Sequence, residues 1–345
     1  MGTLWFWLVA VMIVGYVLLD GFDLGVGVLH LVLVRNEKER RAALSSIGPV
    51  WDGNEVWLLA GGGTLYFAFP PLYASAFSGF YLPLMIVLWL LVARGVSLEL
   101  RNHVDLGVWR SLIDGLFGLA STLLTIFLGA ALANVLRGVP IDADGYFFLP
   151  LWTNWLPGTH PGILDWYTVI GGVIALVALT LHGALWLTVK VSGDLEARAR
   201  RIASPLVAIL ALLTLVSLLA TMAVRPQSLD NYHEYPLTFA LPVAVVLALA
   251  AIWLFNRAQQ PLKAFLASCL YLFLMLAGAC WGVYPTVLPS TTGHDLTIAN
   301  SLSGPHTLAI GLAWWSCGMI LAIGYVVFVY SRFRGKSDAS EEAGH

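Results

Sequence analysis

Charged residues and cysteine are both scarce in this chain of 345 residues. Only 11% of the residues are charged, whereas 59% are hydrophobic, and the mean hydropathy is +0.81. Soluble domains carry about 25% charged residues, so the composition excludes a water-soluble protein and indicates one that lives in a lipid bilayer. The formal net charge of −2 gives no reason to expect a nucleic-acid partner.

The few cysteines lack the short paired spacings of zinc sites and redox motifs. Cys269, Cys280 and Cys317 all lie in apolar stretches. We therefore expect them to be buried as small hydrophobic side chains.

Apolar runs long enough to cross a bilayer, about 20 residues each, recur along the chain. The nine runs cover residues 4–34, 53–69, 76–100, 112–136, 163–189, 203–224, 237–256, 262–287 and 304–331. They are continuously apolar rather than alternating, which excludes a transmembrane β-barrel, and no strands are predicted. The expected fold class is an all-α integral membrane protein with about nine transmembrane helices over residues 1–332.

The runs also predict how the chain is organised. Residues 1–136 and 163–287 could each form a four-helix bundle, with residues 304–331 as a ninth, peripheral helix. The first run has no basic n-region and no cleavage pattern, so we expect a retained helix rather than a signal peptide. The short polar segment 333–345 is predicted to be a disordered cytoplasmic tail.

Basic residues indicate that the N-terminus lies outside and the C-terminus in the cytoplasm, because cytoplasmic segments are enriched in Lys and Arg. With this orientation, fifteen of the 18 Lys and Arg residues fall in cytoplasmic segments. Arg137 and Arg225 fall in outer connections, and Arg94 lies within the third run. The second run is the weakest, since it is short and contains Gly61–Gly63, but without it the alternation would fail.

Two acids lie in the first run, where a charge is costly and therefore a functional candidate. Asp20 and Asp23 are three residues apart on one helix face, roughly 18–22 Å from the cytoplasmic end of the helix. Two carboxylates this close in a low dielectric cannot both ionise cheaply, so one is expected to keep a proton. Gly21, Gly25 and Gly27 would allow another helix to approach closely. Acids that only fix helix packing are the alternative.

The second run opens with the polar residues Asp52, Asn54 and Glu55. Asp52 as N-cap with Glu55 three residues later would form a capping box. The same side chains could instead receive protons from cytoplasmic water. The sequence leaves both interpretations open.

The third run ends with Arg94 and Glu99. Arg94 lies about one and a half turns before the cytoplasmic end, close enough to extend its side chain to the interface. Beside the Asp20/Asp23 pair it becomes a candidate counter-ion. Together with Asp52, these residues have the composition of a proton path from the cytoplasm to the middle of the membrane.

Histidine gives only weak indications of a cofactor. His30 and His182 lie within runs, but no two histidines have the i, i+4 spacing of a metal site. Each could be a lone axial haem ligand, although a hydrogen-bonded interior histidine is the favoured interpretation.

Several of these clusters resemble one protein family. The runs GYVLLDGFDLGVGVL (15–29), IGPVWDGNEVWLLAGGGTLYFAFPPLYASAFSGFY (47–81) and RGVSLELR (94–101) closely resemble subunit II of the cytochrome bd quinol oxidases. The resemblance is dense over residues 5–101 and looser, mainly in topology, to about residue 332.

The resemblance implies a haem-free subunit built from two four-helix bundles and one peripheral helix. It would pair with a subunit I that carries haems b and d, in a complex that oxidises quinol and reduces O₂ to water. The location would be a bacterial or archaeal cytoplasmic membrane. No cofactor is predicted to bind this chain. A structural quinone and small single-helix accessory subunits remain open, because no residues match either.

The resemblance also implies roles for individual residues. Those that resemble the family's cytoplasmic proton channel, as acids or as polar groups near its mouth, are Asp20, Asp23, Asp52, Arg94 and Glu99. Trp57 resembles a tryptophan near an oxygen access route. Glu55 stands where some members have a neutral amide, so its role is open.

Two alternatives come from other classes of protein. An ion-coupled secondary transporter also places acids and glycine-interrupted helices near the membrane midplane, commonly in repeated halves. Residues 163–331, however, contain no counterpart of the DGFD element at 20–23. A purely structural scaffold, whose acids only bind a partner subunit, is the second alternative.

Overall fold

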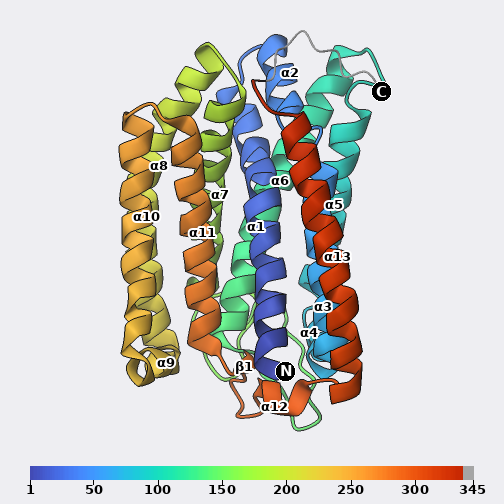
Figure 1. The fold of residues 1–345 in the computed structure, drawn as a ribbon, viewed down its shortest axis with the longest axis vertical. Helices are drawn as coiled ribbons and strands as arrows, with labels where there is room; N and C mark the ends of the chain where they lie inside the picture. The colour runs from blue at the N-terminus through green and yellow to red at the C-terminus, as the bar shows by residue number, and fades with distance from the viewer. Residues whose placement is uncertain (337–345) are drawn as a thin grey trace.

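The structure, a computed structural model, describes residues 1–336. The part of the predicted tail from residue 337 onward lies outside the described residues. Long helices run side by side along one axis of the molecule (Figure 1). These helices are α1 (Gly2–Leu33), α3 (Trp51–Ala68), α5 (Tyr81–Leu100), α6 (Gly107–Arg137), α7 (Trp166–Lys190), α8 (Asp194–Val224), α10 (Ala240–Arg257), α11 (Pro261–Val283) and α13 (Pro305–Arg332).

Among the described residues, 8 helices are long and apolar enough to cross a membrane. The predicted span that falls short is α3, since its first turns contain Asp52, Asn54 and Glu55. It nevertheless runs beside α1 and continues past a break at Phe69 into α4 (Pro70–Gly79) (Figure 1). Pro70 has no backbone N–H to donate, so the helix restarts there. The predicted all-α, multi-pass fold is confirmed.

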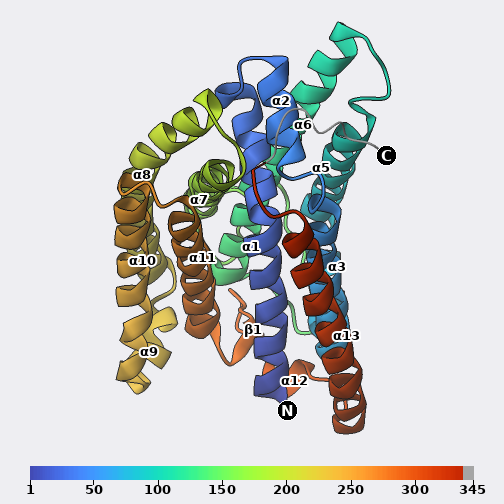
Figure 2. The same ribbon diagram turned by 45° about the horizontal axis from the view of Figure 1, so that its top comes forward.

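The helices form two groups with α13 outside them. Helices α3 and α6 pack against α1, α5 packs against α6, and α7 packs against both α1 and α6. Helices α8, α10 and α11 complete the second group, on the opposite side of α1 from α13 (Figure 2). Helix α13 contacts α3, and Leu308 is its one fully buried residue.

The glycines beside the acid pair allow the close helix contacts that the sequence predicted. A Cβ atom on Gly25 would lie 1.9 Å from the carbonyl oxygen of Leu179 in α7, and one on Gly183 would lie 2.4 Å from the backbone of Gly25. Gly27 faces a different helix, because its Cβ would lie 2.1 Å from Ser121 Oγ in α6. The small residues of α1 thus hold two neighbours rather than one.

The expected burial of the cysteines is wrong for Cys317. Cys269 and Cys280 are half-buried, whereas Cys317 is exposed on α13. Hydropathy does not distinguish a face that meets lipid from one that packs on protein, and most of α13 lacks protein neighbours.

The end of the molecule where the chain starts carries most of the irregular structure. Its short elements are η1 (Pro226–Leu229), α9 (Asp230–Glu234), η2 (Pro236–Phe239), β1 (Thr286–Leu288), β2 (Leu296–Thr297) and α12 (Ile298–Ser301). The prediction of no strands is wrong here, since β1 and β2 pair antiparallel. Apolar loop residues such as Ile141 and Leu149 pack with Leu288 and with Trp5 of α1. Arg137 bonds to Asp165, which also caps α7.

At the other end, ion pairs tie the basic connecting segments together. Helix α2 (Glu37–Ser45) lies here, and Arg198 Nη2 is 2.5 Å from Glu39 Oε2. Lys336 Nζ is 2.5 Å from Glu196 Oε2. The segments that the sequence assigned to the cytoplasm therefore share one end of the molecule.

Candidate functional site

Asp20 and Arg94 form an ion pair deep inside the first helix group. Arg94 Nη1 and Nη2 donate to the two carboxylate oxygens of Asp20, at 2.8 and 2.5 Å. Both residues are 0% exposed. A two-pronged pair between a guanidinium and a carboxylate is among the strongest polar contacts in proteins. The candidate counter-ion is therefore confirmed, and its carboxylate partner is Asp20.

Asp23 has a different environment, although it lies on the same face of α1. The side-chain amide of Asn54 donates to Asp23 Oδ2 at 2.8 Å and to the carbonyl oxygen of Leu19 at 3.1 Å. Tyr330 of α13 donates to Asn54 Oδ1 at 3.0 Å. Asp23 Oδ1 is buried and has no hydrogen-bond partner in the described chain. No cationic side chain of the described residues contacts Asp23, so the two acids are not equivalent.

The acids at the start of α3 divide between the buried network and the surface. Glu55 Oε2 is 3.9 Å from Arg94 Nη1, and the Glu55 side chain is 22% exposed. Asp52 is exposed, one turn of helix earlier. The capping-box interpretation is wrong, because the N-cap of α3 is Val50 and no side chain caps the helix. Asp52 is therefore exposed at the surface of the described chain, one helical turn from Glu55.

Glu99 does not join this network. Its side chain is exposed near the end of α5, and only its backbone carbonyl accepts a hydrogen bond, from His103 at 3.0 Å. Arg94 lies on the other side of the same helix, which turns about 100° per residue. The sequence predicted a shared site, and the helix phase separates the two residues.

Trp57 packs against α1 at a glycine. A Cβ atom on Gly15 would lie 2.4 Å from Cε3 of the Trp57 ring, so the indole lies directly on the bare backbone of α1. Trp57 is half-buried. The ring thus fills the contact between α1 and α3 about one and a half helical turns from Asp20, and part of it remains exposed.

Both intramembrane histidines are hydrogen-bonded interior residues, as the favoured interpretation expected. His182 Nδ1 lies 2.7 Å from Ser268 Oγ, and its Nε2 lies 3.1 Å from the carbonyl oxygen of Leu18. His30 Nε2 lies 2.9 Å from Asp114 Oδ1. Within the part of the chain that the structure describes, no group of three His, Cys, Asp or Glu side chains is arranged to hold a metal ion.

Sequence analysis missed a second charged cluster, centred on Asp114. Besides His30, this buried carboxylate accepts from Arg40 Nη1 at 2.7 Å and from Arg101 Nε at 2.7 Å. Arg101 also donates to both carboxylate oxygens of Glu37, at 3.1 and 3.0 Å. Asp114 lies inside the predicted run 112–136, so the rule that selected Asp20 would have selected it as well.

The cluster around Asp114 reaches the end of the molecule that carries the basic connecting segments. Arg101 holds the pKa of Glu37 below its usual value, because its two hydrogen bonds outweigh the opposing effect of partial burial. The side chain of Glu37 is 40% exposed, whereas that of Asp114 is 2% exposed. Glu37, Arg101 and Asp114 therefore form a chain of contacts that leads from the protein surface to the buried interior.

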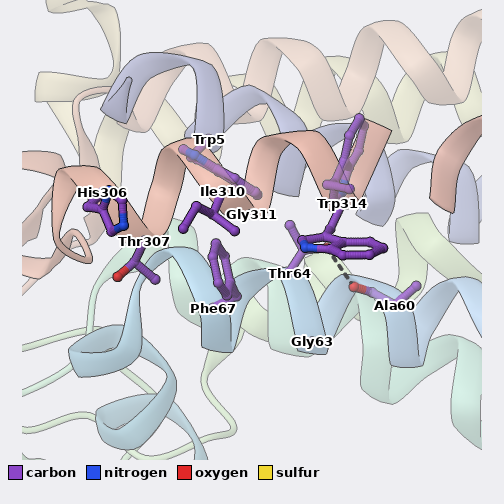
Figure 3. Close-up of a pocket in the computed structure, with 11 residues that line it drawn as sticks. Trp5, Ala60, Gly63, Thr64, Phe67, His306, Thr307, Ile310, Gly311 and Trp314 are labelled. Carbon is purple, nitrogen blue, oxygen red and sulfur yellow. Dashed lines mark hydrogen bonds between the residues drawn. The ribbon is translucent and has the colours of Figure 1, made fainter. Parts of the chain in front are cut away.

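A groove of about 510 Å³ lies elsewhere, between the last turns of α3 and the first turns of α13 (Figure 3). Trp5, Phe67 and Trp314 supply much of its aromatic lining. Thr64 donates to the carbonyl oxygen of Ala60 at 2.8 Å. None of the buried acids lines this groove, so it is separate from the charged network.

The fold and the buried ion pairs define a polytopic helical membrane protein that keeps charged groups in its interior. The family model for cytochrome bd terminal oxidase subunit II matches residues 1–333. The chain belongs to this family and is therefore a subunit of an oxidoreductase complex of the membrane. Membership over nearly the whole chain leaves no basis for the transporter alternative.

Individual relatives cover the chain almost completely. Cytochrome bd ubiquinol oxidase subunit 2 of Bacillus subtilis is 33% identical over 98% of this chain and 97% of its own length. Cytochrome bd-I ubiquinol oxidase subunit 2 of Escherichia coli K12 is 31% identical over 96% of this chain and 94% of its own. In the bd oxidase structure from Geobacillus thermodenitrificans, one chain shares the fold, with a TM-score of 0.73, 18% identity, and coverage of 96% and 98%.

Proposed function

We propose that this chain is the haem-free subunit of a cytochrome bd-type quinol oxidase, which oxidises quinol and reduces O₂ to water. Its partner is a subunit I that carries haems b and d. The names of the B. subtilis and E. coli relatives support quinol as the electron donor. The haem-free assignment is supported by His182, whose two ring nitrogens both have hydrogen-bond partners within the chain.

The proposed orientation places the N-terminus outside and the end of α13 in the cytoplasm of a bacterial or archaeal cell. The ion pairs Arg198–Glu39 and Lys336–Glu196 gather the basic segments at one end. Positive segments of this kind stay on the cytoplasmic side. The proposed bundles comprise residues 1–136 and 163–287, with α13 peripheral to both.

The proposed contribution to the reaction is a proton path from the cytoplasm to the acids of α1. Glu55 is partly exposed and lies 3.9 Å from Arg94, which in turn holds Asp20. Asp52 lies at the mouth, where an exposed carboxylate collects protons from water. Protons would then pass by way of Glu55 and the Asp20 region to Asp23. Glu99, on the other side of α5, stays outside this route.

Charge balance assigns the proton-carrying role to Asp23. One guanidinium balances one carboxylate, and Arg94 is already bonded to Asp20 through both of its terminal nitrogens. A second buried carboxylate without a cation is strongly unfavourable, so Asp23 rests as the neutral acid. Its unpartnered Oδ1 can then donate or accept a proton without breaking the ion pair.

An oxygen access route along Trp57 is a further part of the proposal. The indole lies at the contact between α1 and α3 and keeps one edge at the surface. Apolar surface of this kind favours an uncharged gas over ions. A Trp57→Ala variant should change the apparent KM for O₂ while the rate at saturating O₂ stays unchanged. A change in the saturated rate alone would contradict this assignment.

The observation that carries the proton path is the unequal pairing of Asp20 and Asp23. Asp23→Asn in the assembled oxidase should lower O₂ consumption by about tenfold or more, because a positioned proton carrier is lost. The matched control is Asp144→Asn, an exposed acid of an outer loop, which should leave turnover unchanged. Loss of haem from the Asp23 variant would favour the scaffold alternative. Full haem content with unchanged turnover would contradict the path.

A further inference from the structure

The interior of the first helix group holds a row of buried polar atoms that have no hydrogen-bond partner within the described part of the chain. Among the described residues, these atoms include Tyr16 Oη, Asp23 Oδ1, His30 Nδ1 and Ser121 Oγ. Tyr16 is 4% exposed, His30 is 1% exposed, and Asp23 and Ser121 are fully buried. Buried polar atoms in native proteins nearly always have a hydrogen-bond partner, and ordered water supplies it where protein does not.

Three of these residues form one stripe along α1. Tyr16, Asp23 and His30 are seven residues apart. Seven residues are close to two full helical turns, so the direction of the side chain shifts by only about 20° at each step. The stripe faces α3 and α6, since Asp23 meets Asn54 of α3 and His30 meets Asp114 of α6.

The fourth unpartnered atom, Ser121 Oγ, lies at a height along α1 between His30 and Asp23. The Ser121 hydroxyl lies over the bare backbone of Gly27, where a Cβ atom would come within 2.1 Å of it. Gly27 lies about 4.5 Å along the helix axis from His30 and about 6 Å from Asp23. These axial steps are comparable to one or two hydrogen-bonded steps between water oxygens, which measure about 2.8 Å each.

The His30 end of the stripe connects to the cytoplasmic end of the molecule. His30 Nε2 bonds to Asp114 at 2.9 Å, and Arg101 links Asp114 to the exposed carboxylate of Glu37. An imidazole suits a junction of this kind because it has two ring nitrogens. Arg40 and Arg101 hold Asp114 as a carboxylate. Asp114 can therefore stabilise His30 while the imidazole binds a proton, which His30 then releases from Nδ1 with its own charge restored.

We infer that a file of ordered water molecules runs inside the first helix group from His30 past Ser121 to Asp23 and Tyr16. It gives the acid pair a second proton route from the cytoplasm, through the Asp114 cluster. This route rests on the proposed function, since it delivers protons to the same Asp23, but it is separate from the route through Glu55. Each water accepts a proton on one side and passes one on, so no proton is gained or lost along the file.

The direct test is an experimental structure of the complete oxidase at a resolution that shows ordered water. Water density should lie within hydrogen-bond distance of Ser121 Oγ, His30 Nδ1 and Asp23 Oδ1. A dry interior at these atoms would overturn the inference, whatever the outcome of any mutational test.

The functional test replaces the hydroxyl of Ser121 by two methyl groups, which fill more space and cannot form hydrogen bonds. Ser121→Val should block the file and lower O₂ consumption by about twofold or more, because one of two parallel routes is lost. The matched control is Thr125→Val, one turn further along α6. Thr125 is fully buried too, but its hydroxyl already bonds to the carbonyl oxygen of Ser121 at 2.8 Å. This control should keep its full rate.

Parallel routes have a further signature in a double variant. Glu55→Gln combined with Ser121→Val should lower turnover by more than the product of the two single effects. Equal turnover of Ser121→Val and Thr125→Val, both with full haem content, would refute the second route. If Asp23→Asn still slows the enzyme, that result leaves the proposed function intact. If Asp23→Asn also has no effect, both proposals fail.

Discussion

The buried pair of Asp20 and Arg94 provides a quantitative prediction about stability. Arg94→Gln removes the cation and leaves the Asp20 carboxylate fully buried without a partner. Breaking a buried ion pair on one side costs about 3–5 kcal/mol. An ion pair with a similar separation at the protein surface contributes far less to stability. Arg110 Nη2 lies 2.8 Å from Asp105 Oδ1, but these side chains are 28% and 90% exposed, so Arg110→Gln should cost about 0.2–1 kcal/mol.

A double-mutant cycle separates the pair from its surroundings. Asp20→Asn and Arg94→Gln should each destabilise the protein, and the double variant should recover part of the loss because neither charge is then left alone. Buried charged pairs in contact give interaction energies up to about 3 kcal/mol, and we expect a value of about 2–3 kcal/mol. Arg94→Lys should restore only part of the stability, since an ammonium group cannot bond to both oxygens in the planar arrangement of a guanidinium.

The assay is unfolding of the solubilised oxidase by titration with sodium dodecyl sulfate, followed by the fluorescence of the tryptophans. All variants are compared at one pH and one protein concentration. The account of the pair is refuted if Arg94→Gln is no more destabilising than Arg110→Gln. It is refuted as well if the cycle is additive within about 0.5 kcal/mol.

Three further predictions concern other parts of the molecule. Arg101 lowers the pKa of Glu37. The ion pair of Glu37 therefore stabilises the fold above the unfolded pKa of about 4.3, and this stabilisation is lost as the pH falls through the lower folded pKa. Hydrogen exchange of α2, relative to its intrinsic rate, should stay slow at pH 5 and accelerate only below about pH 4. Gly25→Ala should disrupt the contact of α1 with α7 and lower the yield of assembled oxidase, whereas Gly62→Ala, with open space around it, should not. Asp52→Asn should slow turnover less than the Asp23 variant does, because Asp52 is exposed and water can replace it; an equal loss would contradict its place at the mouth.

Much of the fold could be predicted from the sequence because a bilayer demands long apolar helices. The nine runs correspond to the long helices, and the glycines of α1 correctly indicated close packing. The second run was predicted to span the membrane because the alternation of basic segments requires a crossing there. Helix α3 alone is too polar to be recognised as a span by its hydropathy. The hairpin of β1 and β2 could not be predicted, since strands this short leave no periodic pattern in the sequence.

The site was only partly predictable because sequence spacing fixes neighbours within one helix but not between helices. An intramembrane acid pair and a nearby arginine were enough to expect an ion pair. Which acid Arg94 would bind depends on the rotation of α5 relative to α1, which also moved Glu99 away from the network. The rule for acids inside apolar runs applied to Asp114 too, but it was overlooked because it lies only three residues into its run, close to the expected helix end.

The most direct test of the central claim is proton uptake from the cytoplasmic side during a single turnover. The oxidase is reconstituted into vesicles with its cytoplasmic face outward, reduced, mixed rapidly with O₂, and followed with a pH-sensitive dye. We predict that Asp23→Asn slows proton uptake and haem oxidation together, with haem content unchanged. Proton uptake at the unmodified rate in that variant would contradict the claim that Asp23 carries protons to the oxygen-reducing partner.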